Sequence, residues 1–318
     1  MRPLVPMRPL VNLAVIALLA VPLRLAAAEQ SFPARVEEAA SAFAGQPGVL
    51  AGTTDDQRKR LVVFLTGNIV FTLAHEFGHV VISEFGLPVL GREEDAADNF
   101  ATLTLVQIGG SFAHQVMVDA ARGLLMLGRD DARAGANDPV KFYDEHGLGP
   151  QRAGQIICLL YGSDPPAFEV LARRAYLPDE RRDSCAADFQ QMSETWRQLL
   201  APNLGRAGQS LWQRLFRRGR EASPAGIMPV TYGEAPENLK PIRSFLVRLG
   251  LLETVRDYAV QNFAFRPGIR LEAASCGEPN AWWDPEERKL TLCYELVVAM
   301  LPAAIETINN PQDAAPPR

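Results

Sequence analysis

An unusually apolar stretch covers residues 61–82, LVVFLTGNIVFTLAHEFGHVVI. Its few polar side chains recur at spacings of three and four, which places them on one stripe of a helix that is otherwise apolar. A helix of this kind belongs in a protein core, so we predict a buried helix with one polar face. Thr53 or Thr54 is expected to cap its start, and Gly86 with Pro88 to end it. The polar stripe consists of Asn68, Thr72, His75, Glu76, His79 and Ser83.

A membrane span is the competing interpretation of this segment. Its fully apolar runs are too short for that role, and Thr66, Gly67 and Asn68 interrupt them. Gly78 inside the helix costs about 1 kcal/mol relative to alanine. We therefore expect a neighbouring backbone to approach the helix closely at Gly78.

The remaining pattern predicts further helices, and strands close to the C-terminus. We predict an α+β fold, mainly α, with a small antiparallel sheet near the C-terminus and a hairpin turn at 284–288. A second helix opens at Glu93, after a turn rich in glycine and proline. Other helices are predicted at 32–45, 111–129, 150–162, 165–175, 185–201, 237–263 and 295–308, and strands at 230–233, 268–276, 281–283 and 289–296.

The first 28 residues have the three regions of a secretory signal peptide. Arg2 and Arg8 precede an apolar run, and three alanines before Glu29 offer a cleavage site. An uncleaved membrane anchor is the alternative, but the run is short and Arg24 follows it directly. We expect a periplasmic or secreted protein with one domain over 29–310, a possible lobe boundary near 205–227, and a disordered tail at 311–318.

Net charge limits the classes of binding partner, and cysteine content indicates the cellular compartment. Residues 1–28 hold three of the 32 basic residues and no acids, so the rest has 29 basic against 37 acidic residues, about −8. This charge argues against nucleic acid and against an anionic membrane surface. The four cysteines predict two disulfides in an exported protein, and the pairing Cys158–Cys185 with Cys276–Cys293 is favoured.

Candidate chemistry lies in the pentapeptide His75-Glu76-Phe77-Gly78-His79. Two histidines four residues apart lie on one helical face and can share one metal ion, here one Zn²⁺ per chain. Glu76 is placed to accept a proton from a water molecule that the metal activates. The alternative is a chance match, with two ordinary helix histidines.

A third ligand is expected at the start of the second helix. The sequence Glu93-Glu94-Asp95-Ala96-Ala97-Asp98 predicts Glu94 as ligand and Asp98, one turn later, as hydrogen-bond partner of a ligating histidine. Glu93 and Asp95 are rivals for the ligand role. The acids also suit a helix N-terminus without any metal.

HExxH followed by ExxAD resembles the thermolysin- and neprilysin-like zincins, whose third zinc ligand is a glutamate. The segments HEFGH, LPVLGREEDAAD, YGSDP and CGEPNAWWDPEERKLTLCYEL resemble an uncharacterised bacterial metallopeptidase family over residues 55–300. These resemblances imply a zincin-like fold. The stretch NAWWDP is similar to the edge strand that pairs with substrate in neprilysin-like enzymes, which would place Asn280 and Ala281 along the cleft. In those enzymes the stretch precedes HExxH, whereas here it follows HExxH, so the topology would be permuted. An ordinary hairpin is the alternative.

His146 lies in a loop flanked by Asp144 and Glu145, which suits a donor to the oxyanion of a tetrahedral intermediate. A solvated loop histidine is the alternative. His114 is expected to be an ordinary core or surface residue. The tyrosines Tyr143, Tyr161 and Tyr232 are further possible oxyanion donors.

The sequence thus predicts an exported zinc metallopeptidase that hydrolyses peptide bonds with Glu76 as general base. Its partner would be a peptide or protein substrate. A non-catalytic zinc-bound scaffold that binds peptides or proteins is the alternative function. We expect no stable membrane span once the signal peptide is cleaved.

Overall fold

The structure is a computed structural model that describes residues 34–39, 53–134, 144–204 and 228–309, and for 127–134 the backbone alone. The expected signal peptide, the possible lobe boundary at 205–227, the tail at 311–318 and Tyr143 lie outside the described residues, so these expectations stay predictions.

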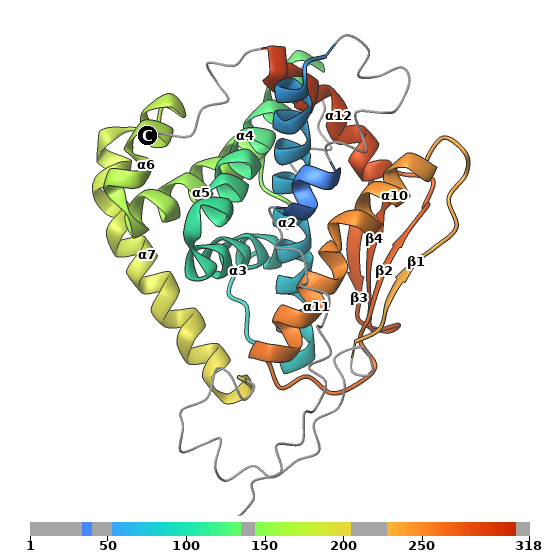
Figure 1. Ribbon diagram of the computed structural model, residues 1–318. Helices are drawn as coiled ribbons and strands as arrows, with labels where there is room; N and C mark the ends of the chain where they lie inside the picture. The colour runs from blue at the N-terminus through green and yellow to red at the C-terminus, as the bar shows by residue number, and fades with distance from the viewer. Residues whose placement is uncertain (1–33, 40–52, 135–143, 205–227, 310–318) are drawn as a thin grey trace, which may run out of the picture. The chain divides into compact units, whose positions relative to one another are not determined.

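The described part is mainly helical, with one small sheet near the C-terminus (Figure 1). Residues 34–39 are also helical. The labelled elements are α2 (Asp55–Phe85), α3 (Glu93–Ile108), α4 (Gly110–Ala134), α5 (Gly149–Ser163), α6 (Pro165–Arg174), α7 (Asp179–Leu200), η2 (Ala201–Asn203), β1 (Val230–Tyr232), α10 (Lys240–Leu249), α11 (Leu251–Asn262), β2 (Arg270–Ala274), β3 (Ala281–Asp284), β4 (Lys289–Cys293) and α12 (Tyr294–Asn309).

Helix α2 is the element around which the others pack. Thr54 caps it through a capping box with Gln57, and Gly86 ends it in the left-handed region at φ 57°. By length and composition α2 passes for a membrane span, but 72% of its apolar window is buried inside the protein. Core helices of soluble proteins pass the same test, so the finding fits the buried helix that the sequence predicts.

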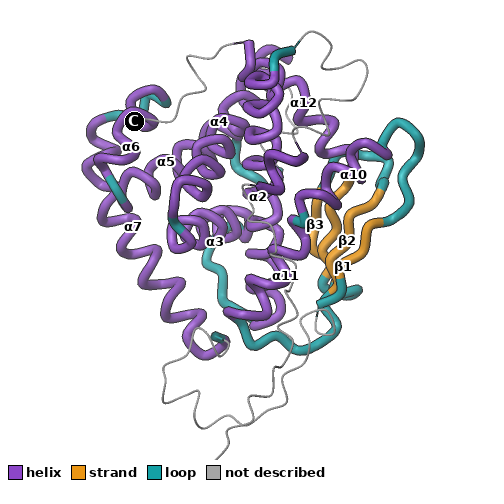
Figure 2. Tube along the Cα trace, in the orientation of Figure 1, coloured by secondary structure: helices purple, strands orange, loops and turns teal. Residues whose placement is uncertain are grey.

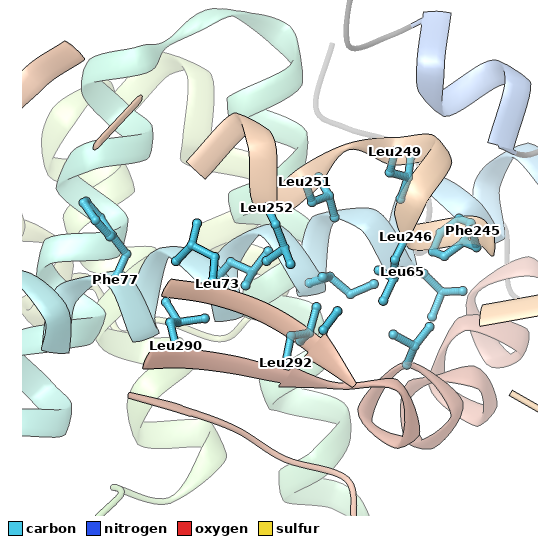
Figure 3. Packing of buried hydrophobic residues seen from close by; sticks show 14 of the residues in the cluster. Leu65, Leu73, Phe77, Phe245, Leu246, Leu249, Leu251, Leu252, Leu290 and Leu292 are labelled. Atoms are coloured by element: carbon cyan, nitrogen blue, oxygen red, sulfur yellow. The ribbon is translucent and has the colours of Figure 1, made fainter. Parts of the chain in front are cut away.

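Two apolar clusters flank α2. One joins α2 to α10, α11, α12 and the sheet. Figure 3 shows Leu73 of α2 near Leu252 and Leu290, and Leu65 of α2 near Leu246. The other joins Phe71 of α2 to side chains of α3, α4, α5 and α6. In Figure 2 the helices α3, α4 and α5 accordingly lie on one side of α2 and the strands on the other. Because apolar side chains surround most of α2, only its polar stripe is left to form a site.

The sheet has the strand order β1-β2-β4-β3 and is mixed, which corrects the antiparallel sheet that the sequence predicts. β2 pairs in parallel with both β1 and β4, and only β3 and β4 form an antiparallel hairpin. The crossover through α10 and α11 makes β1 and β2 parallel. The second strand of the hairpin, whose Leu290 and Leu292 are fully buried, takes the central place beside β2 and leaves β3 at the edge.

The predicted helix at 237–263 is two helices. Gly250 adopts φ 60°, ends α10 and precedes α11, so the chain changes direction there. Glycine adopts this left-handed conformation at little cost. The apolar pattern continues on both sides of Gly250, so the sequence pattern alone predicts one continuous helix.

Helices α2 and α3 approach each other closely at Gly78, as the sequence predicts. A Cβ atom at Gly78 would lie 3.0 Å from the Cα atom of Ala97 and 3.3 Å from its carbonyl oxygen. The missing side chain on α2 and the small one on α3 therefore allow the two backbones to pack directly against each other.

Two disulfides have the pairing that the sequence favours. Cys158–Cys185 joins α5 to α7, and Cys276–Cys293 joins the segment after β2 to the end of β4. An ion pair joins the β3–β4 hairpin to α2. Arg288, in the turn of the hairpin, donates two hydrogen bonds of 2.7 Å to Glu84 near the end of α2. This ion pair fixes the hairpin to the same helix that carries the histidines.

We predict that Gly78→Ala destabilises the protein, because overpacking against backbone atoms costs about 1–3 kcal/mol and outweighs the roughly 1 kcal/mol that alanine gains in a helix. Gly154→Ala in α5 is the matched control, since a Cβ atom there meets nothing within 4 Å. The control should be neutral or stabilising. Denaturant unfolding of both variants is the measurement, and a Gly78→Ala protein as stable as the control would refute the close-packing argument.

Candidate metal centre

His75 and His79 turn the same ring nitrogen toward one point. They lie one turn apart on α2, and their Nε2 atoms are 3.3 Å from each other. The rings meet edge to face with centroids 4.9 Å apart. His75 is buried, while 13% of the His79 side chain is exposed.

Glu94, in the first turn of α3, supplies a third atom at this point. Its Oε2 atom lies 3.0 Å from Nε2 of His75 and 3.4 Å from Nε2 of His79. Donor atoms about 2.0–2.1 Å from a tetrahedral zinc ion lie about 3.3–3.4 Å from each other. The triangle of these three atoms therefore has the size of one face of such a coordination shell.

The opposite ring nitrogens of the two histidines are each held by a carboxylate. Nδ1 of His75 lies 2.8 Å from Oδ1 of Asp98, and Nδ1 of His79 lies 2.8 Å from Oε1 of Glu93. A neutral imidazole that donates Nδ1–H to a carboxylate has a lone pair on Nε2. With both rings neutral, as in metal ligands, two such lone pairs and the Glu94 carboxylate oxygen would converge, an arrangement that a cation stabilises. The donor set of two imidazoles and one carboxylate fits zinc.

The structure separates the three acids that the sequence leaves as rivals for the ligand role. Glu94 places an oxygen between the two Nε2 atoms. Glu93 contacts the far side of the His79 ring, and Asp95 is exposed. Of the three acids, only Glu94 thus has an oxygen within 3.4 Å of both Nε2 atoms, whereas Glu93 contacts Nδ1 of His79.

Arg152 of α5 belongs to this site, although nothing in the sequence singles it out. Its Nε and Nη2 atoms donate to the two carboxylate oxygens of Asp98 at 2.7 and 2.8 Å. The guanidinium therefore fixes the carboxylate that in turn holds His75. Fifty-four residues separate Arg152 from Asp98, so only the packing of α5 against α3 reveals the pair.

Electrostatics at the site favour a positive charge between the imidazoles. Burial lowers the pKa of His75, but its hydrogen bonds to Asp98 and Glu94 outweigh burial and raise this pKa to about 9. The pKa of His79 is raised in the same way by Glu94 and Glu93, against the effect of burial. The negative field that would hold protons on these rings would equally hold a divalent cation.

The pKa values of the Asp98 and Glu94 carboxylates are lowered, in contrast to those of the histidines. Burial would raise the pKa of Asp98, but Arg152 and His75 hold it at about 2. Burial acts on Glu94 as well, and hydrogen bonds from the surrounding imidazoles move its pKa far below the usual value. Both groups are therefore ionised at neutral pH and can serve as ligand and as hydrogen-bond acceptor.

Glu76 is the exception among the acids of this site. It is 7% exposed, and no hydrogen bond or ion pair within the described part of the chain engages its carboxylate. Burial raises its pKa, opposed by the nearby charges of His75 and His79. Its oxygens are not among the fully enclosed atoms of the described residues that lack a partner, so they keep some access to solvent and can exchange a proton.

The structure brings His146 to the same place. Its Nε2 atom lies 2.7 Å from Oε2 of Glu94, and its ring stacks on that of His75 with centroids 5.8 Å apart. Nδ1 of His146 lies 3.3 Å from Oδ1 of Asp144, which also accepts the main-chain N–H of His146 at 2.9 Å. The donor atoms of His75, Glu94 and His146 all lie within 4.8 Å of one another.

Other predicted residues belong to other elements or are engaged elsewhere. Ala281 begins the edge strand β3, which packs against α2, and Asn280 directly precedes it. The His114 ring packs on Phe168 of the α4–α5–α6 core, and the Tyr232 hydroxyl donates to Glu253 at 2.8 Å. The Tyr161 hydroxyl likewise interacts with Glu169.

A comparison with family models gives one match. The model described as "Putative metallopeptidase" matches residues 46–200 and 233–314, which together make up well over half of the chain. No curated protein and no solved structure matches the chain. The matched ranges contain each residue of the cluster described above.

We predict that Arg152→Ala weakens zinc binding by up to the ~10–100-fold that loss of a ligand's hydrogen-bond partner costs, because Asp98, the partner of His75, then loses its own bidentate partner. Arg152→Lys should rescue only part of this loss, since lysine cannot make two parallel hydrogen bonds. Arg197→Ala, at an exposed ion pair on α7, is the control. Chelator competition measures the affinity, and unchanged affinity in Arg152→Ala would show that Asp98 needs no such support.

Proposed function

The chain belongs to the metallopeptidase family whose model matches it, and from this premise we propose that it is an exported, zinc-dependent peptidase. His75, His79 and Glu94 would hold the ion, in the two-imidazole, one-carboxylate combination known from catalytic zinc sites. The spacing of their donor atoms, 3.0 to 3.4 Å, supports this assignment.

A zinc ion at this point would acidify a water molecule and polarise the carbonyl group of a peptide bond. Glu76 would accept the proton of the attacking water and pass it to the amine of the leaving peptide. The observation that carries this role is the state of its carboxylate, which is buried, adjacent to both imidazoles, and without a protein partner among the described residues. A purely structural metal site has no use for such a group.

The remaining acids would act on the geometry of the site. Asp98, held by Arg152, fixes the ring of His75, and Glu93 fixes the ring of His79. Rings held at Nδ1 keep Nε2 directed at the ion and lose little freedom on binding it. These three residues are therefore proposed as positioning residues.

Strand β3 is the proposed binding site for an extended peptide. The Cys293 N–H donates to the Asn280 carbonyl at 3.0 Å, so these two residues form a hydrogen-bonded pair of the hairpin. Hydrogen-bonded and non-hydrogen-bonded pairs alternate along antiparallel strands. Ala281 and Trp283 are therefore in non-hydrogen-bonded pairs, and their main-chain groups point away from β4. The Asn280 side chain already accepts the N–H of Ala281 at 2.9 Å. The main chain of Trp283 is thus the outward-facing position left for pairing with substrate.

The disulfides support the proposed location outside the cytoplasm. Two disulfides among four cysteines are typical of exported proteins and rare in the reducing cytosol. Together with the signal-peptide pattern of residues 1–28, they support a periplasmic or secreted enzyme. The acidic balance supports a peptide or protein as partner instead of nucleic acid.

A second candidate function is a scaffold that binds zinc and a peptide without hydrolysis. The contact of His146 with Glu94 favours it, because four protein ligands close a zinc site to substrate. The unengaged Glu76 argues for the enzyme.

We predict that Glu76→Gln keeps zinc and stability but lowers peptide hydrolysis by at least the ~10²–10⁴-fold typical of a general base. Glutamine has nearly the same volume and cannot accept the proton. Glu180→Gln, at an exposed position in the first turn of α7, is the control and should keep full activity. The assay is a peptide library incubated with the three proteins with and without chelator. The same cleavage products from wild type and Glu76→Gln, or none from either, would favour the scaffold.

The inactive Glu76→Gln variant also tests the substrate strand. A bound peptide that extends the sheet should protect the Trp283 amide from hydrogen exchange, while the Thr291 amide on the inner strand changes little. Saturating peptide without protection at Trp283 would place the substrate elsewhere.

A further inference from the structure

We propose that His146 is a fourth, exchangeable protein ligand of the zinc ion in the resting protein. This inference rests on the proposed function, since it concerns the same ion that His75, His79 and Glu94 would hold. It assigns His146 to metal binding instead of the oxyanion role that the sequence suggests.

The environment of His146 repeats that of the two helix histidines. In all three residues Nε2 lies within 3.4 Å of the same Glu94 oxygen, at 3.0, 3.4 and 2.7 Å for His75, His79 and His146. In all three Nδ1 has a carboxylate within 3.3 Å, which comes from a different residue each time. A histidine with Nδ1 on a carboxylate and Nε2 on the ion is the usual form of a metal ligand.

The contacts on the two sides of the His146 ring fix its orientation. Asp144 lies 3.3 Å from Nδ1 and also accepts the main-chain N–H of His146 at 2.9 Å, while Nε2 is directed at the Glu94 oxygen 2.7 Å away. An imidazole held in this way places Nε2 at the same oxygen that His75 and His79 face, which is the position of a ligand.

His146 differs from the other two histidines in how firmly it is held. Its side chain is 44% exposed, against 4% for His75 and 13% for His79, and it comes from the segment before α5 instead of a buried helix. An exposed ligand on a non-helical segment can leave and return at a lower cost than a buried one on α2. Exchange requires only that the His146 Nε2 lone pair leave the ion and an oxygen donor take its place.

Four protein ligands leave no position for the attacking water or for a substrate carbonyl. Glu76 would then have no proton to accept until His146 moves away. The resting protein would therefore be latent, and substrate would compete with His146 for one coordination position.

X-ray absorption of the zinc-loaded protein tests the inference directly, because it counts the imidazoles bound to the ion. Three are expected in wild type and two in His146→Ala. Chelator competition should show zinc affinity in His146→Ala reduced by at least ~10–100-fold, the cost of losing even an outer-shell partner of a ligand. His114→Ala removes the remaining histidine, which packs on Phe168 at a ring distance of 5.0 Å, and should match wild type in both measurements.

Two imidazoles in wild type, or an unchanged affinity in His146→Ala, would overturn the fourth-ligand assignment and leave the proposed function intact. The wild-type count decides the matter even if His146→Ala fails to fold. Failure of the proposed function has a different signature. Wild type would then bind no stoichiometric zinc, or His75→Ala would bind it as tightly as wild type, and the present inference would fall with it.

Discussion

The close approach of α2 and α3 at Gly78 and Ala97 is the constraint on which the site depends. Gly78 lies between the two histidines of α2, and Ala97 lies between Glu94 and Asp98 of α3. With the backbones this close, α3 reaches both ends of the His75 ring, placing Glu94 at Nε2 and Asp98 at Nδ1. A larger side chain at either position would separate the helices. The donor atoms would then no longer lie at the separations that one small ion requires.

A second consequence of this packing is a concentration of negative charge at the site. Asp98 is buried, Glu94 is largely buried and Glu93 lies half exposed at the edge. Each of these acids contacts an imidazole, and Arg152 offsets only part of their charge. Such a group of acids is unfavourable in a protein interior unless cations or hydrogen bonds compensate it. A divalent ion provides that compensation, which links the stability of the site to its occupancy. Glu76 is a fourth acid near the imidazoles, and no hydrogen bond or ion pair joins it to the described residues.

Local sequence patterns predict much of this structure, because the features they encode are local. Residue types and spacing predict the buried helix, a threonine cap at its start, the stop at Gly86 and the close approach at Gly78. The structure has Thr54 as the cap, and the disulfides have the pairing that the sequence favours. The order of strands does not follow from local patterns, since β2 pairs with the second strand of the hairpin through burial of Leu290 and Leu292, a tertiary effect. The role of Arg152 likewise cannot be predicted from the sequence, because no local pattern indicates that an arginine on an amphipathic helix pairs with a residue 54 positions away.

The central claim is that one zinc ion is held between α2 and the start of α3, with Glu94 as the acidic ligand. Native mass spectrometry of the zinc-supplemented protein tests it most directly when Glu94→Ala is compared with Glu93→Ala. These two neighbouring acids differ in role, because Glu94 faces both Nε2 atoms and Glu93 contacts only Nδ1 of His79. The account predicts one zinc per chain in wild type, retention in Glu93→Ala and loss in Glu94→Ala. Zinc retained without Glu94 and lost without Glu93, or absent from wild type, would contradict it.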